Sequence, residues 1–220
     1  MKEKLTEMVF ILDRSGSMSG LESDTIGGFN SMLEKQKREP GKAYVTTVLF
    51  DSRYELLHDH LMIQEVDPMT QRQYYVRGCT ALLDAIGKTI QKIVNIQKNA
   101  GPSGKADHVI FVITTDGLEN ASREYSCGRV KEMIEYQKEK YGWEFLFLGA
   151  NMDAVKEAGH LGIQPDRAAS YINDPDGVRL NYEVLSETVS CMRMGAKPEG
   201  SEWKSSIERR NEEKRKRNKK

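Results

Sequence analysis

The sequence predicts an α/β fold, in which a doubly wound, mostly parallel sheet with one antiparallel edge strand carries helices on both faces. Short apolar runs alternate with longer segments whose apolar residues recur every three or four positions, as strands and helices do. The runs 8–12 and 109–113 are apolar throughout, which is typical of strands buried on both faces. Polar residues follow both runs and mark the carboxyl edge of the sheet, where such folds bind ligands.

The first half of the chain predicts strands and helices in alternation. After the first strand, apolar residues between 26 and 33 share one face of a helix, which Glu39-Pro40-Gly41 ends. Gly27 and Gly28 allow this helix to approach the sheet closely. The apolar run 43–50 predicts a strand, and the alternating run 54–63 predicts its antiparallel neighbour at the sheet edge, because only a short turn separates them.

The second half repeats the alternation. Apolar residues between 82 and 94 have helical spacing, and a glycine-rich loop at 101–104 leads from that helix to the strand at 109–113. The remaining expected elements are, in order, helix 130–137, strand 144–148, helix 154–158, strand 168–172 and a closing helix 178–192.

Length and charge divide the chain into a domain and a tail. The 220 residues are 38% hydrophobic, enough for one core. Net charge is zero, yet residues 204–220 hold nine Lys or Arg and three Glu, which leaves the preceding part mildly acidic. We expect residues 1–203 to form the domain and 204–220 a basic, partly disordered tail, because the tail has no apolar periodicity. Such a tail either keeps the end soluble or binds nucleic acid or an acidic partner.

The sequence predicts a cytoplasmic protein without a membrane span. No apolar run approaches the roughly 20 residues that a spanning helix needs, and the first run is too short for a signal peptide. The three cysteines, Cys79, Cys127 and Cys191, are odd in number and widely spaced, which argues against a disulfide framework. We expect free thiols, with Cys79 a small buried residue in a tight loop.

Oxygen-bearing side chains gather in three loops. Asp13, Ser15 and Ser17 follow the first strand as D-x-S-x-S, Thr80 opens the helix near 82, and Asp116 follows the strand at 109–113. Carboxylate and hydroxyl oxygens suit a hard cation such as Mg²⁺ better than a softer metal. Each loop alone also fits an ordinary turn, because Asp, Ser and Gly are common turn residues.

Together the three loops resemble the metal-ion-dependent adhesion site, MIDAS, of the von Willebrand factor A (vWA) domain, which has a Rossmann-like fold. The resemblance covers about residues 5–195 and carries the family's residue types in the family's order. It implies that one Mg²⁺ or Mn²⁺ is held by Asp13, Ser15, Ser17, Thr80 and Asp116. The segment 143–154 is also similar to free-standing bacterial and phage members of the family.

The resemblance implies a protein-interaction module, in which an Asp or Glu side chain of a partner protein completes the metal coordination. We do not expect an enzyme, because no second group of residues supplies a general base or nucleophile. The alternative is a Mg²⁺-dependent phosphohydrolase with Asp13 as nucleophile, although Ser15 stands where such enzymes place a second carboxylate. Nucleic-acid binding is expected only through the basic tail.

Three other patterns have simpler explanations. Gly101–Lys105 resembles part of a phosphate-binding loop, but Ala106 stands where that loop needs Ser or Thr. His58 and His60 are expected to share an exposed face of the edge strand, with no third metal ligand in sight. Glu119 fits a carboxylate at a helix entrance better than an outer ligand of the metal.

Overall fold

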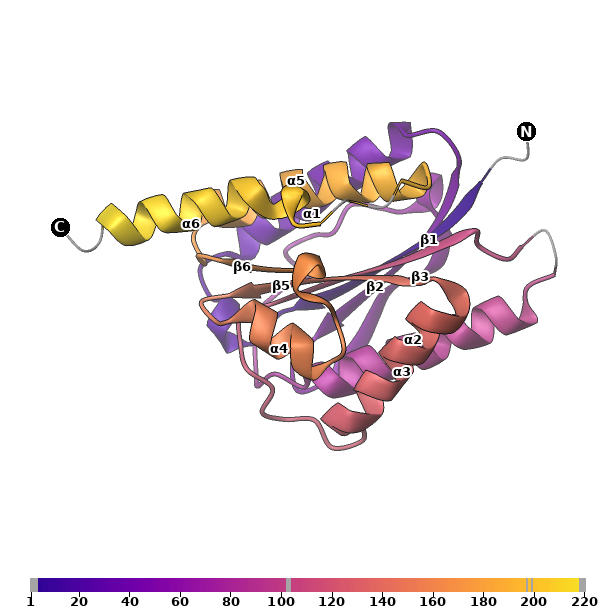
Figure 1. Cartoon of the computed structure of the whole chain (residues 1–220), viewed down its shortest axis with the longest axis horizontal. Helices are drawn as coiled ribbons and strands as arrows, with labels where there is room; N and C mark the ends of the chain where they lie inside the picture. The colour runs from indigo at the N-terminus through magenta and orange to yellow at the C-terminus, as the bar shows by residue number, and fades with distance from the viewer. Residues whose placement is uncertain (1–3, 102–103, 197, 199, 218–220) are drawn as a thin grey trace.

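The computed structural model describes residues 4–101, 104–196, 198 and 200–217, and it confirms the predicted fold class (Figure 1). Six strands form one sheet in the order β3-β2-β1-β4-β5-β6. Every neighbouring pair is parallel except β2 with β3, so β3 is the predicted antiparallel edge strand. The strands are β1 (Leu5–Asp13), β2 (Lys42–Phe50), β3 (Tyr54–Met62), β4 (His108–Thr115), β5 (Glu144–Ala150) and β6 (Ala168–Tyr171).

Helices cover both faces of the sheet (Figure 1). On one face lie α1 (Glu22–Arg38), α5 (Pro175–Arg193) and α6 (Ser205–Arg217). The other face carries α2 (Leu82–Asn99), α3 (Cys127–Tyr141) and α4 (Ala154–His160). Within the described ranges, no helix is long and apolar enough to cross a membrane.

Strand β1 shows why the central strands are apolar throughout. Phe10 and Leu12 pack into the cluster beneath α1 and α5, whereas Val9 and Ile11 pack into the cluster beneath α2 and α3. Successive side chains of a strand point to opposite faces, and both faces are covered here. The strand is therefore apolar at every one of these positions.

The C-terminal segment differs from the sequence prediction, because residues 205–217 form helix α6 rather than a disordered tail. Ile207 is 1% exposed and belongs to the cluster beneath α5. Lys204 Nζ donates to the carbonyl oxygens of Pro165 and Ala168 at 2.9 and 2.8 Å, and Asn211 donates to Ser170 O at 2.5 Å. One apolar side chain and these polar contacts dock the helix, so α5 is not the last element. Residues 218–220 of the expected tail lie outside the described part.

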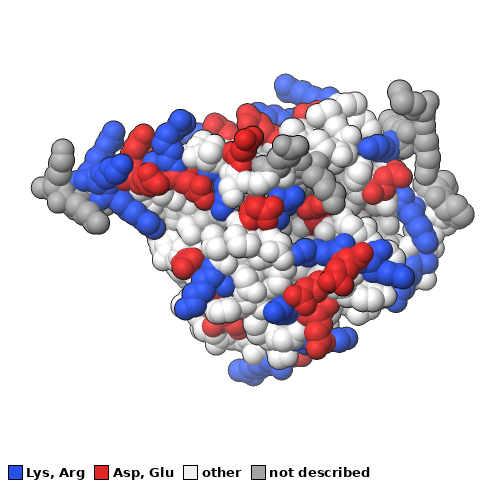
Figure 2. Space-filling model, in the orientation of Figure 1, with Lys and Arg blue, Asp and Glu red and all other residues white. Residues whose placement is uncertain are grey.

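Helix α6 carries the basic charge of this segment beyond the body of the domain. Its C-terminal turns extend past the edge of the sheet where β6 ends (Figure 1). Lys and Arg side chains gather over this projecting end, with acidic residues beside them (Figure 2). The basic character predicted from the sequence is therefore displayed on an ordered helix.

The two histidines of β3 do not share an exposed face, contrary to the prediction. His58 is 5% exposed, and its Nδ1 lies 3.0 Å from Thr47 Oγ1 on the α1 side. His60 instead places Nδ1 2.7 Å from Oε2 of the buried Glu7. The pairing of β3 with β2 shifts register near Thr47, and His60 has a φ of 50°, so a bulge breaks the alternation of side chains.

The three cysteines are free, as predicted, but Cys79 is exposed rather than buried. Its amide donates to Ser52 Oγ at 2.9 Å, and the next residue, Thr80, is the one that turns inward, with 2% exposure. The loop buries the hydroxyl of the metal-site motif and leaves the thiol outside.

Candidate metal centre

Asp13 ends β1 and is held rigidly at the carboxyl edge of the sheet. Its side chain is buried, and each of its carboxylate oxygens accepts a hydrogen bond. The Ser15 amide donates to Oδ1 at 2.7 Å, and Thr115 Oγ1 of β4 donates to Oδ2 at 2.6 Å. Tyr74 adds a bond from its hydroxyl to the Asp13 carbonyl oxygen at 2.5 Å.

The two serines of the D-x-S-x-S loop connect Asp13 to Asp116. The hydroxyl oxygens of Ser15 and Ser17 lie 3.0 Å apart, and Ser17 Oγ donates to Asp116 Oδ1. Ser15 is buried, whereas Ser17 is exposed. The site is therefore closed beneath Ser15 and open to solvent beside Ser17.

Thr80 reaches the same place from the loop before α2. A Cβ built on Gly117 would lie 2.7 Å from Thr80 Oγ1 and 3.4 Å from Ser17 Oγ, so both hydroxyls border this glycine. Any larger residue at position 117 would intrude between the hydroxyls. The structure thus brings together all five residues that the sequence predicts as metal ligands.

Backbone contacts fix the three loops against one another. The Gly16 amide donates to Gly78 O at 3.2 Å, which joins the first loop to the Thr80 loop. Thr80 and Asn120 exchange two bonds, from Thr80 N to Asn120 Oδ1 at 3.0 Å and from Asn120 N to Thr80 O at 3.1 Å. These bonds fix the positions of the side-chain oxygens in the three loops.

Glu119 has the role at a helix entrance that the sequence predicts. Its Oε2 accepts from the Leu83 amide at 2.9 Å, in the first turn of α2. Its other oxygen accepts from the amides of Ala121 and Ser122 at 2.9 and 2.7 Å. Both oxygens are thus engaged in shaping the loop and the start of α2.

The electrostatics of the site favour a bound cation. Burial, the largest cause, outweighs the bond from Ser17, which lowers the pKa of Asp116, and together with the nearby charge of Asp13 it raises that pKa to about 6. Burial also raises the pKa of Asp13. Two partly buried carboxylates close together are costly as anions, and a divalent cation between them removes that cost.

The donor set fits a hard divalent ion. It consists of three hydroxyls and two carboxylates, all oxygen, which is the chemistry that Mg²⁺ and Mn²⁺ prefer. In the part of the chain that the structure describes, no cluster of three or more His, Cys, Asp or Glu side chains offers a competing metal site. The buried Oδ1 of Asn173, beside Asp116, also has no hydrogen-bond partner among the described residues.

Solved structures resemble the chain over most of its length. The vWF domain of the type V pili tip protein Mfa5 from Porphyromonas gingivalis matches with a TM-score of 0.60 at 10% identity, covering 87% of this chain and 97% of that one. Proximal thread matrix protein 1 from the mussel byssus matches with a TM-score of 0.58 at 14% identity, over 86% of this chain and 47% of that one. A von Willebrand factor type A protein from Catenulispora acidiphila matches with a TM-score of 0.56 at 13% identity, over 86% of this chain and 43% of that one.

The chain has a von Willebrand factor A fold. It spans less than half the length of the mussel and Catenulispora proteins, and at these identities the likeness shows the fold alone. No protein-family model matches the sequence, and no curated protein does so. One structure of the mussel protein has a zinc-occupied MIDAS motif.

Sequence reasoning missed two residues that lie beside the candidate metal site. Arg14 lies inside the D-x-S-x-S loop but is fully buried and points away into a charged network with Asp51 and Glu55. Asn173 follows β6 and donates from Nδ2 to Asp116 Oδ2 at 2.7 Å. A single asparagine after a short strand carries no motif, so only the position of β6 in the sheet reveals it.

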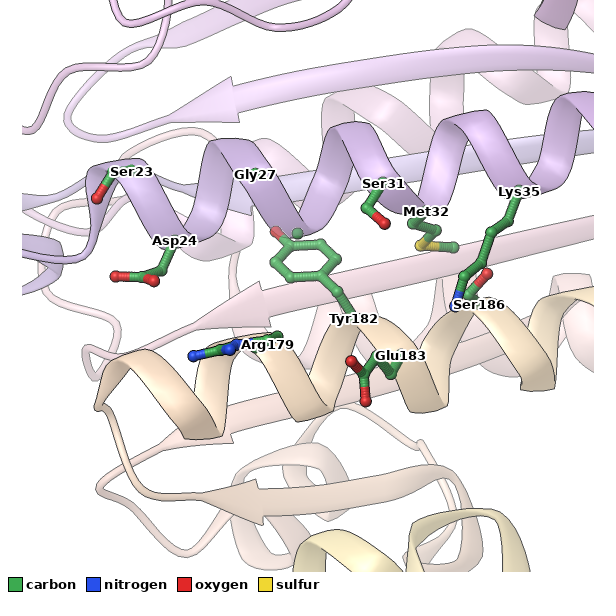
Figure 3. Close-up of a pocket in the computed structure, with 11 residues that line it drawn as sticks. Ser23, Asp24, Gly27, Ser31, Met32, Lys35, Arg179, Tyr182, Glu183 and Ser186 are labelled. Carbon is green, nitrogen blue, oxygen red and sulfur yellow. The ribbon is translucent and has the colours of Figure 1, made fainter.

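A separate groove lies between α1 and α5 of the vWA fold and contains none of the five site residues. Its volume is about 270 Å³, and the ring of Tyr182 points from α5 toward α1 between charged and hydroxyl side chains (Figure 3). Most of its lining residues carry charged or hydroxyl groups, and the groove gives no indication of a ligand.

Proposed function

We propose that this vWA domain is a divalent-metal-dependent protein-interaction module, whose ion takes an Asp or Glu carboxylate from a partner protein. The observation that supports this most directly is the convergence of three hydroxyls and two carboxylates beside the exposed Ser17. When bound, the ion supplies positive charge for an incoming anion. Hydroxyl ligands are neutral, so the ion keeps much of its attraction for a carboxylate.

Binding fits the geometry better than hydrolysis does. A phosphohydrolase would use Asp13 as nucleophile, but both its carboxylate oxygens accept hydrogen bonds, from Ser15 and Thr115, and the residue is 1% exposed. Glu119, the nearest acidic side chain along the chain from Asp116, is committed to the amides of its own loop and of α2. These contacts support a module that is not an enzyme.

The solved neighbours support the coarser statement that such a domain binds metal and partners. The mussel protein holds zinc at its MIDAS motif, and Mfa5 is a protein of a pilus tip. For this chain we propose Mg²⁺ or Mn²⁺, because the site offers only oxygen ligands. We further propose a cytoplasmic location, since its three cysteines are free and exposed, as is common in reducing compartments.

The decisive experiment measures the metal first and the partner second. Calorimetry with Mn²⁺ should give binding heat for the wild-type chain and none for Asp13→Ala. A pull-down in Mg²⁺ should capture a partner that is released in chelator, and Thr80→Ala and Asp116→Ala should capture nothing while keeping their melting temperatures. Lys105→Ala, distant from the site, is the control and should capture normally. Equal Mn²⁺ heats from wild type and Asp13→Ala would refute the proposal.

A further inference from the structure

We propose that Asn173 is a sixth residue of the metal centre, which positions Asp116 through Nδ2 and accepts a hydrogen bond through Oδ1 from water in the ion's coordination shell. This inference rests on the proposed metal binding and adds a residue to it. Asn173 lies in the turn between β6 and α5, on a part of the fold that contributes none of the five predicted ligands.

The first support is that both carboxylate oxygens of Asp116 accept hydrogen bonds, each from a different loop. Its Oδ1 accepts from Ser17 of the β1 loop, and its Oδ2 accepts from Asn173 Nδ2 at 2.7 Å. Two donors on opposite oxygens fix the rotation of a carboxylate, so the orientation of this ligand depends on Asn173 as much as on Ser17. Groups that orient metal ligands in this way commonly contribute to affinity.

The second support is the other end of the same amide. Asn173 Oδ1 is buried and has no hydrogen-bond donor among the described residues, although Nδ2 is paired. A buried acceptor left unpaired is destabilising, so the arrangement favours a donor at this position. Mg²⁺ and Mn²⁺ held by few protein groups keep several waters, and such waters are strong donors. Asn173 Oδ1 would accept the missing hydrogen bond from a water of an ion held beside Asp116.

The third support is that the turn carrying Asn173 is firmly anchored. The Asn173 amide donates to Asn151 Oδ1 at 3.3 Å. The next residue, Asp174, caps α5 by accepting from the Gly177 amide at 2.7 Å. Arg210 and Lys214 of α6 also donate to the Asp174 carboxylate, the former at 2.6 Å. Helix α6 therefore holds in place the turn that holds Asp116.

The experiment measures Mn²⁺ affinity by calorimetry on the full chain. Asn173→Ala removes both the donor and the acceptor and should weaken Mn²⁺ binding about tenfold. Asn173→Asp removes the donor but keeps an acceptor oxygen and adds negative charge, so it should weaken Mn²⁺ binding less than Asn173→Ala does. Asn95→Ala is the control, because Asn95 is exposed on α2 and its Oδ1 accepts from Gln91 Nε2 of the same helix. Its affinity should stay within about twofold of wild type, while melts in chelator verify that all variants fold.

Each outcome decides the inference. Wild-type affinity in Asn173→Ala would overturn it. Equal weakening in Asn173→Ala and Asn173→Asp would overturn the acceptor role of Oδ1, since a purely structural role is lost in both. Asp13→Ala, measured alongside, separates this result from the proposed function. If Asp13→Ala binds Mn²⁺ normally, the proposed metal centre itself is refuted. If Asp13→Ala loses Mn²⁺ binding but Asn173→Ala keeps wild-type affinity, only the role of Asn173 is refuted.

Discussion

The Nε atom of Arg14, a fully buried residue, donates a hydrogen bond to Oδ2 of Asp51 at 2.9 Å. This bond joins the metal loop to the turn between β2 and β3. The same guanidinium donates to Glu55 at 2.6 Å and to the Gln73 carbonyl oxygen at 3.1 Å. One side chain therefore connects the D-x-S-x-S loop to two neighbouring segments. The candidate metal site thus lies beside a hydrogen-bonded group of buried charges.

Replacing Arg14 with Leu should destabilise the protein by about 3 kcal/mol, because removing one partner of a buried pair leaves the buried Asp51 with less compensation. Arg77 also donates to Asp51, at 2.8 Å, and this second bond limits the loss of stability in Arg14→Leu. Urea unfolding monitored by circular dichroism gives the free energy of unfolding. Arg53→Leu is the control, since Arg53 is exposed, and should change that free energy by no more than about 0.5 kcal/mol. Similar losses in both variants would contradict the importance of the network.

Ile207→Ala should lower the free energy of unfolding by about 2–4 kcal/mol, because Ile207 is 1% exposed in the cluster beneath α5. The change tests whether α6 belongs to the folded domain. Glu213→Ala, on the exposed side of the same helix, should have little effect. If both variants melt like the wild type, α6 contributes nothing to stability, and the tail predicted from the sequence describes the molecule better.

Asp174→Asn should destabilise the protein at neutral pH, and the effect should fade in acid. Burial alone would raise the pKa of Asp174, but bonds from Lys214, the Gly177 amide and Arg210 outweigh it and lower the pKa. The unfolded chain then binds this proton more readily than the folded one. The stabilisation is present above the unfolded pKa, about 3.9, and is lost as pH falls through the lower folded value.

Urea unfolding from pH 7 down to about pH 3 measures this effect. The difference in the free energy of unfolding between wild type and Asp174→Asn should be largest at pH 7 and should decrease only below about pH 4. Asp176→Asn is the control at pH 7, because that side chain, in the same first turn of α5, is 75% exposed. If the difference in the free energy of unfolding stays constant with pH, the carboxylate charge of Asp174 contributes no stability.

The sequence predicts those parts of the fold whose residues face the sheet. All six strands and the helices α1 to α5 lie where the apolar patterns place them, because each buries a continuous or periodic set of apolar side chains. The loops with Asp13, Thr80 and Asp116 also come together as expected, since the carboxyl ends of β1 and β4 are neighbours. In these regions, local pattern and tertiary environment agree.

The features missed by sequence reasoning depend on single contacts between distant segments. Helix α6 buries only Ile207 as an apolar residue, so its amphipathic pattern is too weak to recognise. The opposite placement of His58 and His60 depends on a bulge in β3 that the side-chain pattern does not show. Asn173 meets Asp116 only because β6 pairs with β5 at the sheet edge. None of these contacts leaves a periodic signal.

The adjacent glycines of α1 are expected to let this helix approach the sheet, but the close contact in the structure is between Gly28 and helix α5. A Cβ at Gly28 would overlap the ring of Tyr182 on α5, whereas a Cβ at Gly27 would meet nothing within 4 Å. The Tyr182 ring lies against this part of α1 (Figure 3). Only one of the two positions therefore requires glycine for packing.

Gly28→Ala should lower the free energy of unfolding by about 1–3 kcal/mol, because the well-packed Tyr182 ring must move. Gly27→Ala should raise it by about 0.5–1 kcal/mol, because alanine is the better helix former and has space at this position. Thermal unfolding resolves both, since 1 kcal/mol shifts the midpoint by about 2–4 °C in a chain of this size. Opposite signs in the two variants would locate the contact between α1 and α5 at a single residue. Equal shifts would show that helix propensity alone, and not the contact with Tyr182, governs both positions.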